Sequence, residues 1–378
     1  MLSANERARY SRHLLLPEIG SAGQEKLKAA RVLVVGAGGL GSPASLYLAA
    51  AGIGTLGVID HDRVELSNLQ RQVLFATTSV GSSKAGAARA RLLALNPEIV
   101  VQAHDLELRA DNAIRIIEQY DLVVDGSDRL TTRYLVNDVC VLLRKPLVSA
   151  AIHRFEGQAM SYVPSQGPCY RCLFPRSADG VAPNCAEAGV LGVLPGILGA
   201  LQAAEALKLV VGIGTPLLGR LLSFDALAMS WQEFRFARRA DCAVCGDAPS
   251  ILSPQDSAAA NVDDSATAIR RLEPGQLQVL LQGQASAAPV LIDVRAAREF
   301  ALSHLPGAVN MPLGELLRRL ADIPQHSFLV FICRSGARSW TAANLAVSAG
   351  RESPAHLEGG LLAWAAALDP AMAVAPLE

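Results

Sequence analysis

Short β-branched runs alternate with alanine-rich stretches of helical length between Arg31 and about Val163. This alternation predicts strands at residues 32–35, 55–59, 98–103, 122–125 and 147–149. Helices are predicted between these strands, at residues 40–51, 84–95, 110–118 and 130–143. Strands that alternate with helices favour a parallel, doubly wound sheet, so the sequence predicts an α/β fold for this region.

The sequence VGAGGLG at residues 35–41 joins the first predicted strand to the first helix and contains G-x-G-x-x-G at Gly36, Gly38 and Gly41. Such a turn lets the backbone approach a phosphate at the start of a helix. Asp60 ends the second strand, where a dinucleotide-binding protein has the acidic residue that holds a ribose. These residues alone leave open an NAD-dependent oxidoreductase.

Further polar residues at neighbouring strand ends favour a triphosphate with Mg²⁺. Asn68 and Arg71 follow the second strand, Lys84 opens the next helix, and Asp125 and Asp128 come at the end of a later strand. Fixed cations beside a phosphate-binding turn, with carboxylates nearby, suit ATP and Mg²⁺, whereas hydride transfer needs no cationic clamp. Taken singly, Arg71 and Lys84 also fit solvated surface charges, and Asp128 also fits a helix N-cap.

Composition restricts the class of protein. The 378 residues carry 34 basic and 35 acidic side chains, a balance that gives no indication of nucleic acid as a partner. The uncharged residues 32–59 are long enough to span a membrane, but glycines divide them into strand, turn, helix and strand. A second apolar run, 188–204, predicts a buried or interface helix. Because the N-terminal residues lack the pattern of a secretory signal, we expect a cytoplasmic protein without membrane contact.

Two C-x-x-C pairs stand out among the seven cysteines, Cys169 with Cys172 and Cys242 with Cys245. Disulfides are not expected in a reducing compartment. A single pair would also fit a redox dithiol, but two pairs favour one closed, four-thiolate zinc site. Such a site has no open coordination position, so we expect a structural role.

Composition changes after Cys245, where a segment rich in Ala, Ser, Asp and Pro lacks periodic apolar spacing. We therefore expect a first domain at residues 1–247, a linker at 248–268 and a second domain at 269–378. The second domain has predicted strands at 290–293 and 328–332, which again indicates a small α/β fold.

The sequence FICRSGARS follows the last of these strands and ends where a helix begins. The backbone amides and helix dipole of such a loop stabilise a thiolate or persulfide on Cys333, and Arg334 and Arg338 add positive charge. A cysteine phosphatase has five residues between its cysteine and arginine, but this loop has only Arg334, Ser335, Gly336 and Ala337 before Arg338. The shorter ring suits a single sulfur atom. A buried cysteine that ends a strand is the structural alternative.

The sequences RYSR, GAGGLG, DHDRVELSNLQRQ, VGSSKA, DGSDRLTTRYLVND and CYRC together closely resemble the MoeB and ThiF adenylyltransferases, relatives of the ubiquitin-activating enzymes. The resemblance extends from Ser3 to Gly246. It implies a Rossmann-like ATP-binding adenylation domain with a structural zinc. It also implies a reaction in which ATP adenylates the C-terminal Gly-Gly carboxylate of a ubiquitin-like sulfur-carrier protein and pyrophosphate is released.

The resemblance assigns site residues position by position. It places ATP at Gly38, Gly39, Gly41, Asp60, Asp62, Asn68, Arg71, Lys84 and Asp128. Arg71 and Asp128 are the implied catalytic residues, and Asp128 coordinates Mg²⁺. Arg12 resembles an arginine that enters the partner subunit's site, which implies a homodimer. The family commonly has Asp-Asn-Phe where this chain has Asp128-Arg129-Leu130, so contacts next to the retained aspartate differ.

Cys185 lies in a segment without regular periodicity. A lone cysteine is commonly a small buried hydrophobe. In ubiquitin-activating relatives, however, a cysteine in the corresponding crossover segment attacks the acyl adenylate. The resemblance therefore implies a catalytic role for Cys185, covalent or as a sulfur relay. Cys140, in the middle of an apolar predicted helix, is expected in the core.

The sequences VLIDVRAAREF, SHLPGAVNMPL, CRSGARS and LEGGLLAW strongly resemble a rhodanese domain. This second resemblance covers residues 269–369. It implies that Cys333 carries sulfur as a persulfide, that Asp293 and Arg295 belong to the framework, and that His304 holds a loop.

The two resemblances together imply a complete reaction. An acyl adenylate is an electrophile and a persulfide is a nucleophile, so their combination yields a thiocarboxylate on the carrier. An upstream donor, a cysteine desulfurase or thiosulfate, would load Cys333. Cys333 or Cys185 would then form an acyl disulfide that another thiol cleaves. The rival interpretation is an NAD-dependent oxidoreductase with a fused, non-catalytic sulfur-sensing module.

Overall fold

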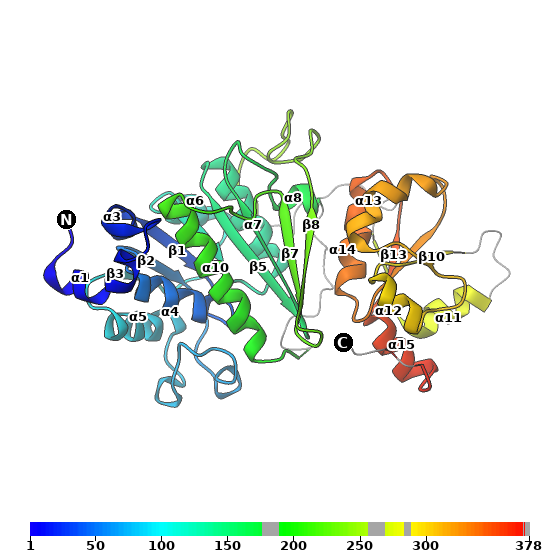
Figure 1. The fold of residues 1–378 in the computed structure, drawn as a ribbon, viewed down its shortest axis with the longest axis horizontal. Coiled ribbons are helices and arrows are strands. Elements are labelled where there is room, and N and C mark those ends of the chain that lie inside the picture. The colour runs from blue at the N-terminus through cyan, green and yellow to red at the C-terminus, as the bar shows by residue number, and fades with distance from the viewer. Residues whose placement is uncertain (176–188, 256–268, 283–288, 373, 375–378) are drawn as a thin grey trace. The chain divides into compact units, whose positions relative to one another are not determined.

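The computed structural model describes residues 1–175, 189–255, 269–282, 289–372 and 374 (Figure 1). Contacts divide the chain into two compact units, one made mostly of residues before 260 and the other mostly of residues after it. Cys185 and most of the predicted linker lie outside the described residues.

The N-terminal part of the chain contains a sheet of eight strands in the order β3-β2-β1-β4-β5-β6-β7-β8. Its strands are β1 Arg31–Val35, β2 Thr55–Ile59, β3 Val100–His104, β4 Leu122–Asp125, β5 Leu147–His153, β6 Glu156–Tyr162, β7 Arg220–Asp225 and β8 Ser230–Arg235. The first five in this order pair in parallel, which confirms the predicted doubly wound sheet.

The antiparallel extension of this sheet was not predicted from the sequence. β6 pairs antiparallel with both β5 and β7. The residues of β6, EGQAMSY, include no β-branched side chain, so the usual strand signal is missing. Pairing with β5 along seven residue positions forms the strand in spite of its weak intrinsic preference.

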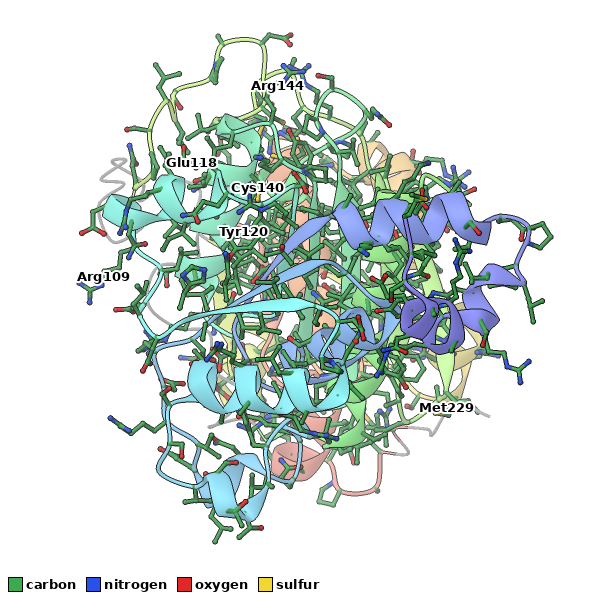
Figure 2. All side chains as sticks on the ribbon, turned by 90° about the vertical axis from the view of Figure 1, so that its left-hand side faces the viewer. Arg109, Glu118, Tyr120, Cys140, Arg144 and Met229 are labelled. Carbon is green, nitrogen blue, oxygen red and sulfur yellow. The ribbon has the colours of Figure 1, made fainter. Side chains whose placement is uncertain are left out.

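Helices cover both faces of this sheet (Figure 1). They are α1 Ala4–Arg9, α2 Ser11–Leu14, α3 Gly20–Ala29, α4 Gly41–Ala51, α5 Lys84–Leu95, α6 Ala110–Ile117, α7 Leu130–Leu142, α8 Tyr170–Leu173 and α10 Val193–Val211, with short 3₁₀ turns η1 Leu66–Asn68 and η2 Thr77–Ser79. α10 contacts α3, α4 and the central strands, whereas α6 contacts α7. Cys140 on α7 is fully buried, as predicted, and so is Tyr120 (Figure 2).

α10 is the only helix among the described residues that is long and apolar enough to cross a membrane. Its packing is that of a core helix: Leu194 and Leu198 are fully buried and cluster with Phe224 of β7. A Cβ at Gly199 would lie 2.3 Å from the carbonyl oxygen of Leu40, so this glycine lets α10 approach the glycine turn closely. The predicted buried helix is therefore present, although it begins at Val193 and continues to Val211.

The C-terminal part of the chain contains a parallel sheet of five strands in the order β11-β10-β12-β13-β9. The strands are β9 Arg270–Leu272, β10 Val290–Asp293, β11 Val309–Asn310, β12 Leu329–Ile332 and β13 Ala355–Leu357. The helices are α11 Pro274–Gln282, α12 Ala297–Leu302, α13 Leu316–Arg319, α14 Ala337–Ser348 and α15 Gly360–Leu368, with 3₁₀ turns η4 Leu313–Glu315 and η5 Leu320–Asp322. The central strand β12 ends immediately before Cys333, and the loop that begins at Cys333 leads into α14, as the sequence predicted.

Candidate functional sites

The glycine turn after β1 is built by very close backbone contacts. Gly36 has a φ of +85°, and a Cβ at Gly41 would lie 1.8 Å from the carbonyl oxygen of Gly36. A Cβ at Gly36 would lie 3.0 Å from the carbonyl oxygen of Gly126, so the loop after β4 abuts the turn. At Gly38, by contrast, the nearest protein atom would be 3.8 Å away, on Gln72. The open side of the turn is therefore at Gly38, where a ligand can approach the backbone.

Asp60 at the end of β2 holds this turn in place. One carboxylate oxygen accepts the backbone N–H of Ala37 at 2.8 Å, and the other accepts the N–H of Asp62 at 2.9 Å. Burial raises the pKa of Asp60, with an opposing effect from the nearby ammonium of Lys84. The predicted ribose-binding carboxylate thus also orients the turn.

The predicted cations gather around the same turn. Lys84 begins α5 and is buried, and its Nζ lies 2.9 Å from a carboxylate oxygen of Asp62. Burial by itself would raise the pKa of Asp62, but the hydrogen bond and charge of Lys84 outweigh it and lower that pKa. The stem of Arg71 lies against Gly39, 3.6 Å from where a Cβ would be, and its Nη1 donates to the carbonyl of Ser67.

Asn68 has a structural hydrogen bond in addition to its predicted phosphate role. Its side chain is buried, and its Oδ1 accepts the backbone N–H of Glu65 at 3.2 Å. Its backbone carbonyl also accepts the N–H groups of Arg71 and Gln72. Asn68 therefore fixes the turn from which Arg71 extends.

The two aspartates at the end of β4 have different surroundings. Asp125 is fully buried and accepts hydrogen bonds from the N–H and hydroxyl of Ser127 and from the hydroxyl of Ser149. It is a framework residue because those donors satisfy its carboxylate inside the protein. Asp128 is exposed, in the loop that abuts Gly36, and of the two it alone is accessible to a cation.

Arg12 lies on α2 with an exposed side chain. Within the part of the chain that the structure describes, it makes no hydrogen bond or ion pair with the nucleotide turn. The predicted ATP residues of one chain thus come together without Arg12, and its role in a partner subunit stays a prediction.

The four predicted zinc ligands do converge. The sulfur atoms of Cys169, Cys172, Cys242 and Cys245 all lie within 4.8 Å of one another, and those of Cys169 and Cys242 are 3.7 Å apart. Tetrahedral thiolates about 2.3 Å from a zinc ion are separated by about 3.8 Å, so the geometry fits the metal. Three of the four cysteines are buried, which suits a closed structural site.

The two residues between Cys169 and Cys172 connect this cluster to α7. Arg171 makes two hydrogen bonds of 2.7 Å to the carboxylate of Asp138. The backbone N–H of Tyr170 donates to the side chain of Asn137 at 2.8 Å. These roles were not predicted from the sequence, although Tyr170 and Arg171 lie within CYRC and Asn137 and Asp138 lie within YLVND.

Arg133 extends the connection from α7 to the nucleotide edge of the sheet. Its guanidinium donates to the carbonyls of Ser127 and Ala150 and lies 3.5 Å from the carboxylate of Asp125. It also lies over the ring of Tyr170, 6.0 Å from the centroid. The buried guanidinium of Arg133 therefore fixes the loop that carries Asp128, and it also contacts Tyr170 in the turn of the first cysteine pair.

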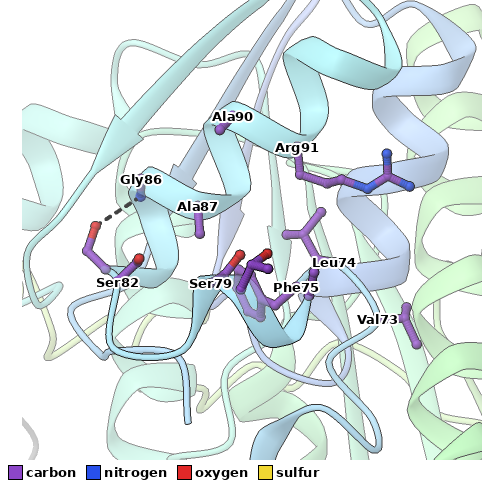
Figure 3. A pocket seen from close by; sticks show the side chains of 12 residues that line it. Val73, Leu74, Phe75, Ser79, Ser82, Gly86, Ala87, Ala90 and Arg91 are labelled. Atoms are coloured by element: carbon purple, nitrogen blue, oxygen red, sulfur yellow. Dashed lines mark hydrogen bonds between the residues drawn. The ribbon is translucent and has the colours of Figure 1, made fainter. Parts of the chain in front are cut away.

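A pocket of about 780 Å³ lies beside the first turns of α5 (Figure 3). Residues of the segment 73–83 line it, together with Gly86, Ala87, Ala90 and Arg91. No predicted ATP residue lines this pocket, so it is distinct from the glycine turn.

Cys333 has the surroundings of an anion-stabilising loop. Its side chain is fully buried, and its sulfur accepts the backbone N–H of Gly336 at 3.1 Å. Gly336 has a φ of +100° and directly precedes α14. A Cβ at Gly360 would lie 2.5 Å from the carbonyl oxygens of both Cys333 and Arg334, so this glycine lets the start of α15 support the loop.

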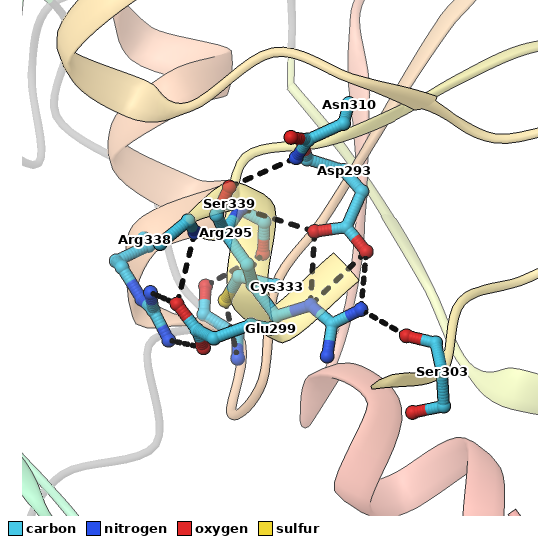
Figure 4. A network of polar contacts seen from close by, with 10 residues as sticks. Asp293, Arg295, Glu299, Ser303, Asn310, Cys333, Arg338 and Ser339 are labelled. Carbon is cyan, nitrogen blue, oxygen red and sulfur yellow. Dashed lines mark hydrogen bonds and ion pairs between the residues drawn. The ribbon is translucent and has the colours of Figure 1, made fainter. Parts of the chain in front are cut away.

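The structure corrects the expectation that Arg334 and Arg338 both add positive charge to the loop. Both guanidinium Nη atoms of Arg338 bond the carboxylate of Glu299, at 2.8 and 3.0 Å, in a buried pair (Figure 4). The charge of Arg338 is thereby balanced from α12. Arg334 is also buried, and its Nε has no hydrogen-bond partner among the described residues. Glu299 could not be predicted from the loop sequence because it is 39 positions away from Arg338.

Asp293 and Arg295 have the predicted framework roles. Arg295 is buried, bonds both carboxylate oxygens of Asp293 and donates to the carbonyl of Ser303 at 2.6 Å (Figure 4). His304 stacks on Phe300 and bonds its carbonyl oxygen at 2.8 Å, so it fixes the loop after α12 to that helix.

The open glycine turn with its converging charges and the separate cysteine loop define a class: a nucleotide-binding transferase joined to a sulfurtransferase-type domain. The family model of the ThiF family matches residues 10–244, and that of the rhodanese-like domain matches residues 274–367. The chain therefore belongs to the ThiF family, with a rhodanese-like domain after it. Its two activities are adenylyl transfer and sulfur transfer.

Relatives share this two-domain organisation. The adenylyltransferase and sulfurtransferase MOCS3 of Aedes aegypti is 42% identical, over 98% of this chain and 89% of the relative. MoeZ of Mycobacterium tuberculosis, described as a probable adenylyltransferase/sulfurtransferase, is 43% identical over 98% of this chain and 96% of its own length. The sulfur carrier protein adenylyltransferase of Thermus thermophilus is 55% identical over 65% of this chain and 93% of the relative.

Among solved structures, E. coli MccB crystallised with ATP is similar to 65% of this chain, with 28% identity, a TM-score of 0.58 and 75% of the MccB chain covered. These relatives and family matches do not support the rival interpretation as an NAD-dependent oxidoreductase with a sulfur-sensing module.

Proposed function

We propose that this enzyme uses ATP to adenylate the C-terminal Gly-Gly carboxylate of a ubiquitin-like sulfur-carrier protein and then converts the acyl adenylate to a thiocarboxylate. The observation that carries the proposal is that one chain combines the adenylation site with a buried cysteine loop suited to a persulfide. Relatives described as adenylyltransferase and sulfurtransferase support the same pairing.

In the first step the carrier carboxylate attacks the α-phosphorus of ATP and pyrophosphate leaves. The backbone at Gly38, Gly39 and Gly41 receives the nucleotide, Asp60 the ribose, and Asn68, Arg71 and Lys84 the phosphates. These cations screen the repulsion between a carboxylate and a polyanion. The exposed carboxylate of Asp128 would hold Mg²⁺, which would supply further charge neutralisation.

In the second step the terminal sulfur of a Cys333 persulfide attacks the acyl carbon and AMP leaves, which gives an acyl disulfide. A thiolate then attacks the Cys333 sulfur, so that the thiocarboxylate leaves and Cys333 ends in a disulfide that a reductant reopens. Cys185 is our candidate for this thiol. A cysteine desulfurase or thiosulfate would load Cys333.

We further propose a zinc ion at Cys169, Cys172, Cys242 and Cys245, and a homodimer in which Arg12 reaches the partner's nucleotide. The exposed position of Arg12 supports the second point. We expect a cytoplasmic enzyme without nucleic acid or membrane among its partners.

The test is ATP–pyrophosphate exchange, measured with and without a ubiquitin-like protein that ends in Gly-Gly. We expect carrier-dependent exchange, its loss in Asp128→Asn, and its retention in Cys333→Ser, which should fail only in thiocarboxylate formation. Absence of carrier-dependent exchange would overturn the proposal. Retention of thiocarboxylate formation by Cys333→Ser would overturn the role of that cysteine.

A further inference from the structure

A line of polar side chains leads away from the Cys333 sulfur, through Ser339 of α14 to His356 of β13. The sulfur lies 3.5 Å from the hydroxyl of Ser339, which in turn lies 3.5 Å from Nδ1 of His356. The other ring nitrogen of His356 lies 3.5 Å from the carboxylate of Glu358. Cys333, Ser339 and His356 are all buried, whereas Glu358 is partly exposed. The line therefore joins a buried thiol to a carboxylate near the surface.

The burial of Cys333 makes its ionisation difficult. A thiol must lose its proton before its sulfur can attack a sulfur donor, and burial in a protein opposes formation of the thiolate. Of the two arginines in the loop sequence, Arg338 has its charge balanced by Glu299, whereas Arg334 follows Cys333 directly and is buried. A proton acceptor within the fold would remove this difficulty because the negative charge on sulfur would form together with a positive charge nearby.

Ser339 has the geometry to pass a proton between the two groups. Its hydroxyl accepts from the Cys333 thiol and donates to the carbonyl oxygen of Gly336 at 2.9 Å. A hydroxyl has one donor and two acceptor positions and turns freely, so it can donate to His356 or to the sulfur instead.

Groups of both kinds face His356: the Glu358 carboxylate favours a positive charge on its ring, whereas the guanidinium of Arg271 opposes it. Glu358 lies on the C-terminal side of the same strand. Trp340 of α14 packs edge-on, with ring centroids 5.2 Å apart. Arg271 of β9 lies over Trp340 and 4.0 Å from Glu358, so it shares that carboxylate with His356.

We propose that Ser339 and His356 form a proton relay for Cys333. The S–H bond of Cys333 breaks as its proton passes to the Ser339 oxygen, and the Ser339 proton passes to Nδ1 of His356. The products are a thiolate, held by the N–H of Gly336, and an imidazolium that faces Glu358. His356 is thus a positioning residue that acts on the sulfur through Ser339, and the inference rests on the proposed role of Cys333 as the sulfur carrier.

The test measures the rate of iodoacetamide alkylation of Cys333 in the full-length protein as a function of pH, by mass spectrometry of the Cys333 peptide. His356→Asn places an amide near the position of Nδ1 but cannot take up a proton. We expect His356→Asn and Ser339→Ala each to raise the apparent pKa of Cys333 by about one unit, hence about tenfold slower alkylation at pH 7. The double variant should be no slower than either single variant because both changes break one relay.

His326→Asn, on an exposed histidine, is the matched control and should leave the profile unchanged. Wild-type profiles in both His356→Asn and Ser339→Ala would overturn the relay. Ser339→Ala decides the matter if His356→Asn unfolds, which thermal unfolding would report.

The assay uses neither ATP nor carrier, and sulfur transfer from thiosulfate to cyanide by Cys333→Ser tests the role of Cys333 separately. The two proposals can therefore fail independently.

Discussion

Arg171 and Asp138 form a two-bond ion pair, with both N–O distances 2.7 Å, between the turn of the first cysteine pair and helix α7. Asp138 is almost completely buried, and Arg171 also lies over the ring of Tyr134, 4.6 Å from its centroid. The same helix carries Arg133, which bonds the carbonyl of Ser127 next to Asp128. The proposed zinc site and the proposed adenylation site thus share one supporting helix.

Asp138→Asn should leave Arg171 without its carboxylate in a nearly buried position. Removing one partner of a buried pair typically costs about 3–5 kcal/mol. We expect a loss of that order in the free energy of unfolding, measured by urea denaturation of the purified protein. Arg171→Leu combined with Asp138→Leu should cost less than the single change, because no charge then remains unpaired. An equal or larger loss in the double variant would contradict this account.

Gly41→Ala should prevent the nucleotide turn from closing. Its Cβ would lie 1.8 Å from the carbonyl oxygen of Gly36, a contact that only a backbone shift can relieve. We expect more than about tenfold loss of ATP–pyrophosphate exchange, since misplacement by about an ångström is enough for such losses.

Gly196→Ala is the matched control for this substitution. Gly196 lies within α10, and a Cβ there would have no atom within 4 Å. Alanine should keep exchange activity and raise the free energy of unfolding by up to about 1 kcal/mol, the usual difference in a helix interior. Comparable activity in the two variants would show that the turn tolerates a side chain at Gly41.

The four-cysteine cluster should bind about one zinc ion per chain, measured by elemental analysis of the purified protein. Cys169→Ser should lower the bound zinc and the temperature of thermal unfolding, because a structural zinc contributes to folding. Cys140→Ser is the control, since Cys140 is buried in α7 outside the cluster. Equal zinc content in the two variants would exclude the proposed ligand set.

Glu299 predicts a pH dependence for the stability of the C-terminal unit. Burial by itself raises the pKa of this carboxyl, but the hydrogen bonds and charge of Arg338 outweigh it, so the net pKa lies below its ordinary value of 4.5. A lowered folded-state pKa means that ionised Glu299 stabilises the fold above about pH 4.5 and that this stabilisation is lost as the pH falls further.

Glu299→Gln tests this prediction. At pH 7 the substitution should lower the free energy of unfolding by about 3–5 kcal/mol, because it leaves Arg338 buried without its counter-ion. The difference from wild type should shrink as the pH falls from about 5 to 3, followed by tryptophan fluorescence in urea. A difference that does not change with pH would show that the carboxylate charge contributes nothing.

Local sequence patterns predicted most elements well. The strands Thr55–Ile59, Leu122–Asp125 and Val290–Asp293 and the helix Lys84–Leu95 have the predicted bounds. Their signals are short-range, since each combines β-branched runs or helical periodicity with clear termini. β6 was missed because its formation depends on pairing with β5 and not on its own residues.

The sequence by itself determined the chemistry available to this protein: a glycine turn for a phosphate, two C-x-x-C pairs for a metal and a cysteine loop for sulfur. Only the tertiary structure decided how the charges are distributed. It bonds the buried carboxylate of Asp125 to Ser149, balances Arg338 with Glu299 and aligns Ser339 with His356. These pairings join residues far apart in the chain, and strand order and helix packing bring them together. A motif records which groups are present, whereas the fold decides which of them remain charged and accessible.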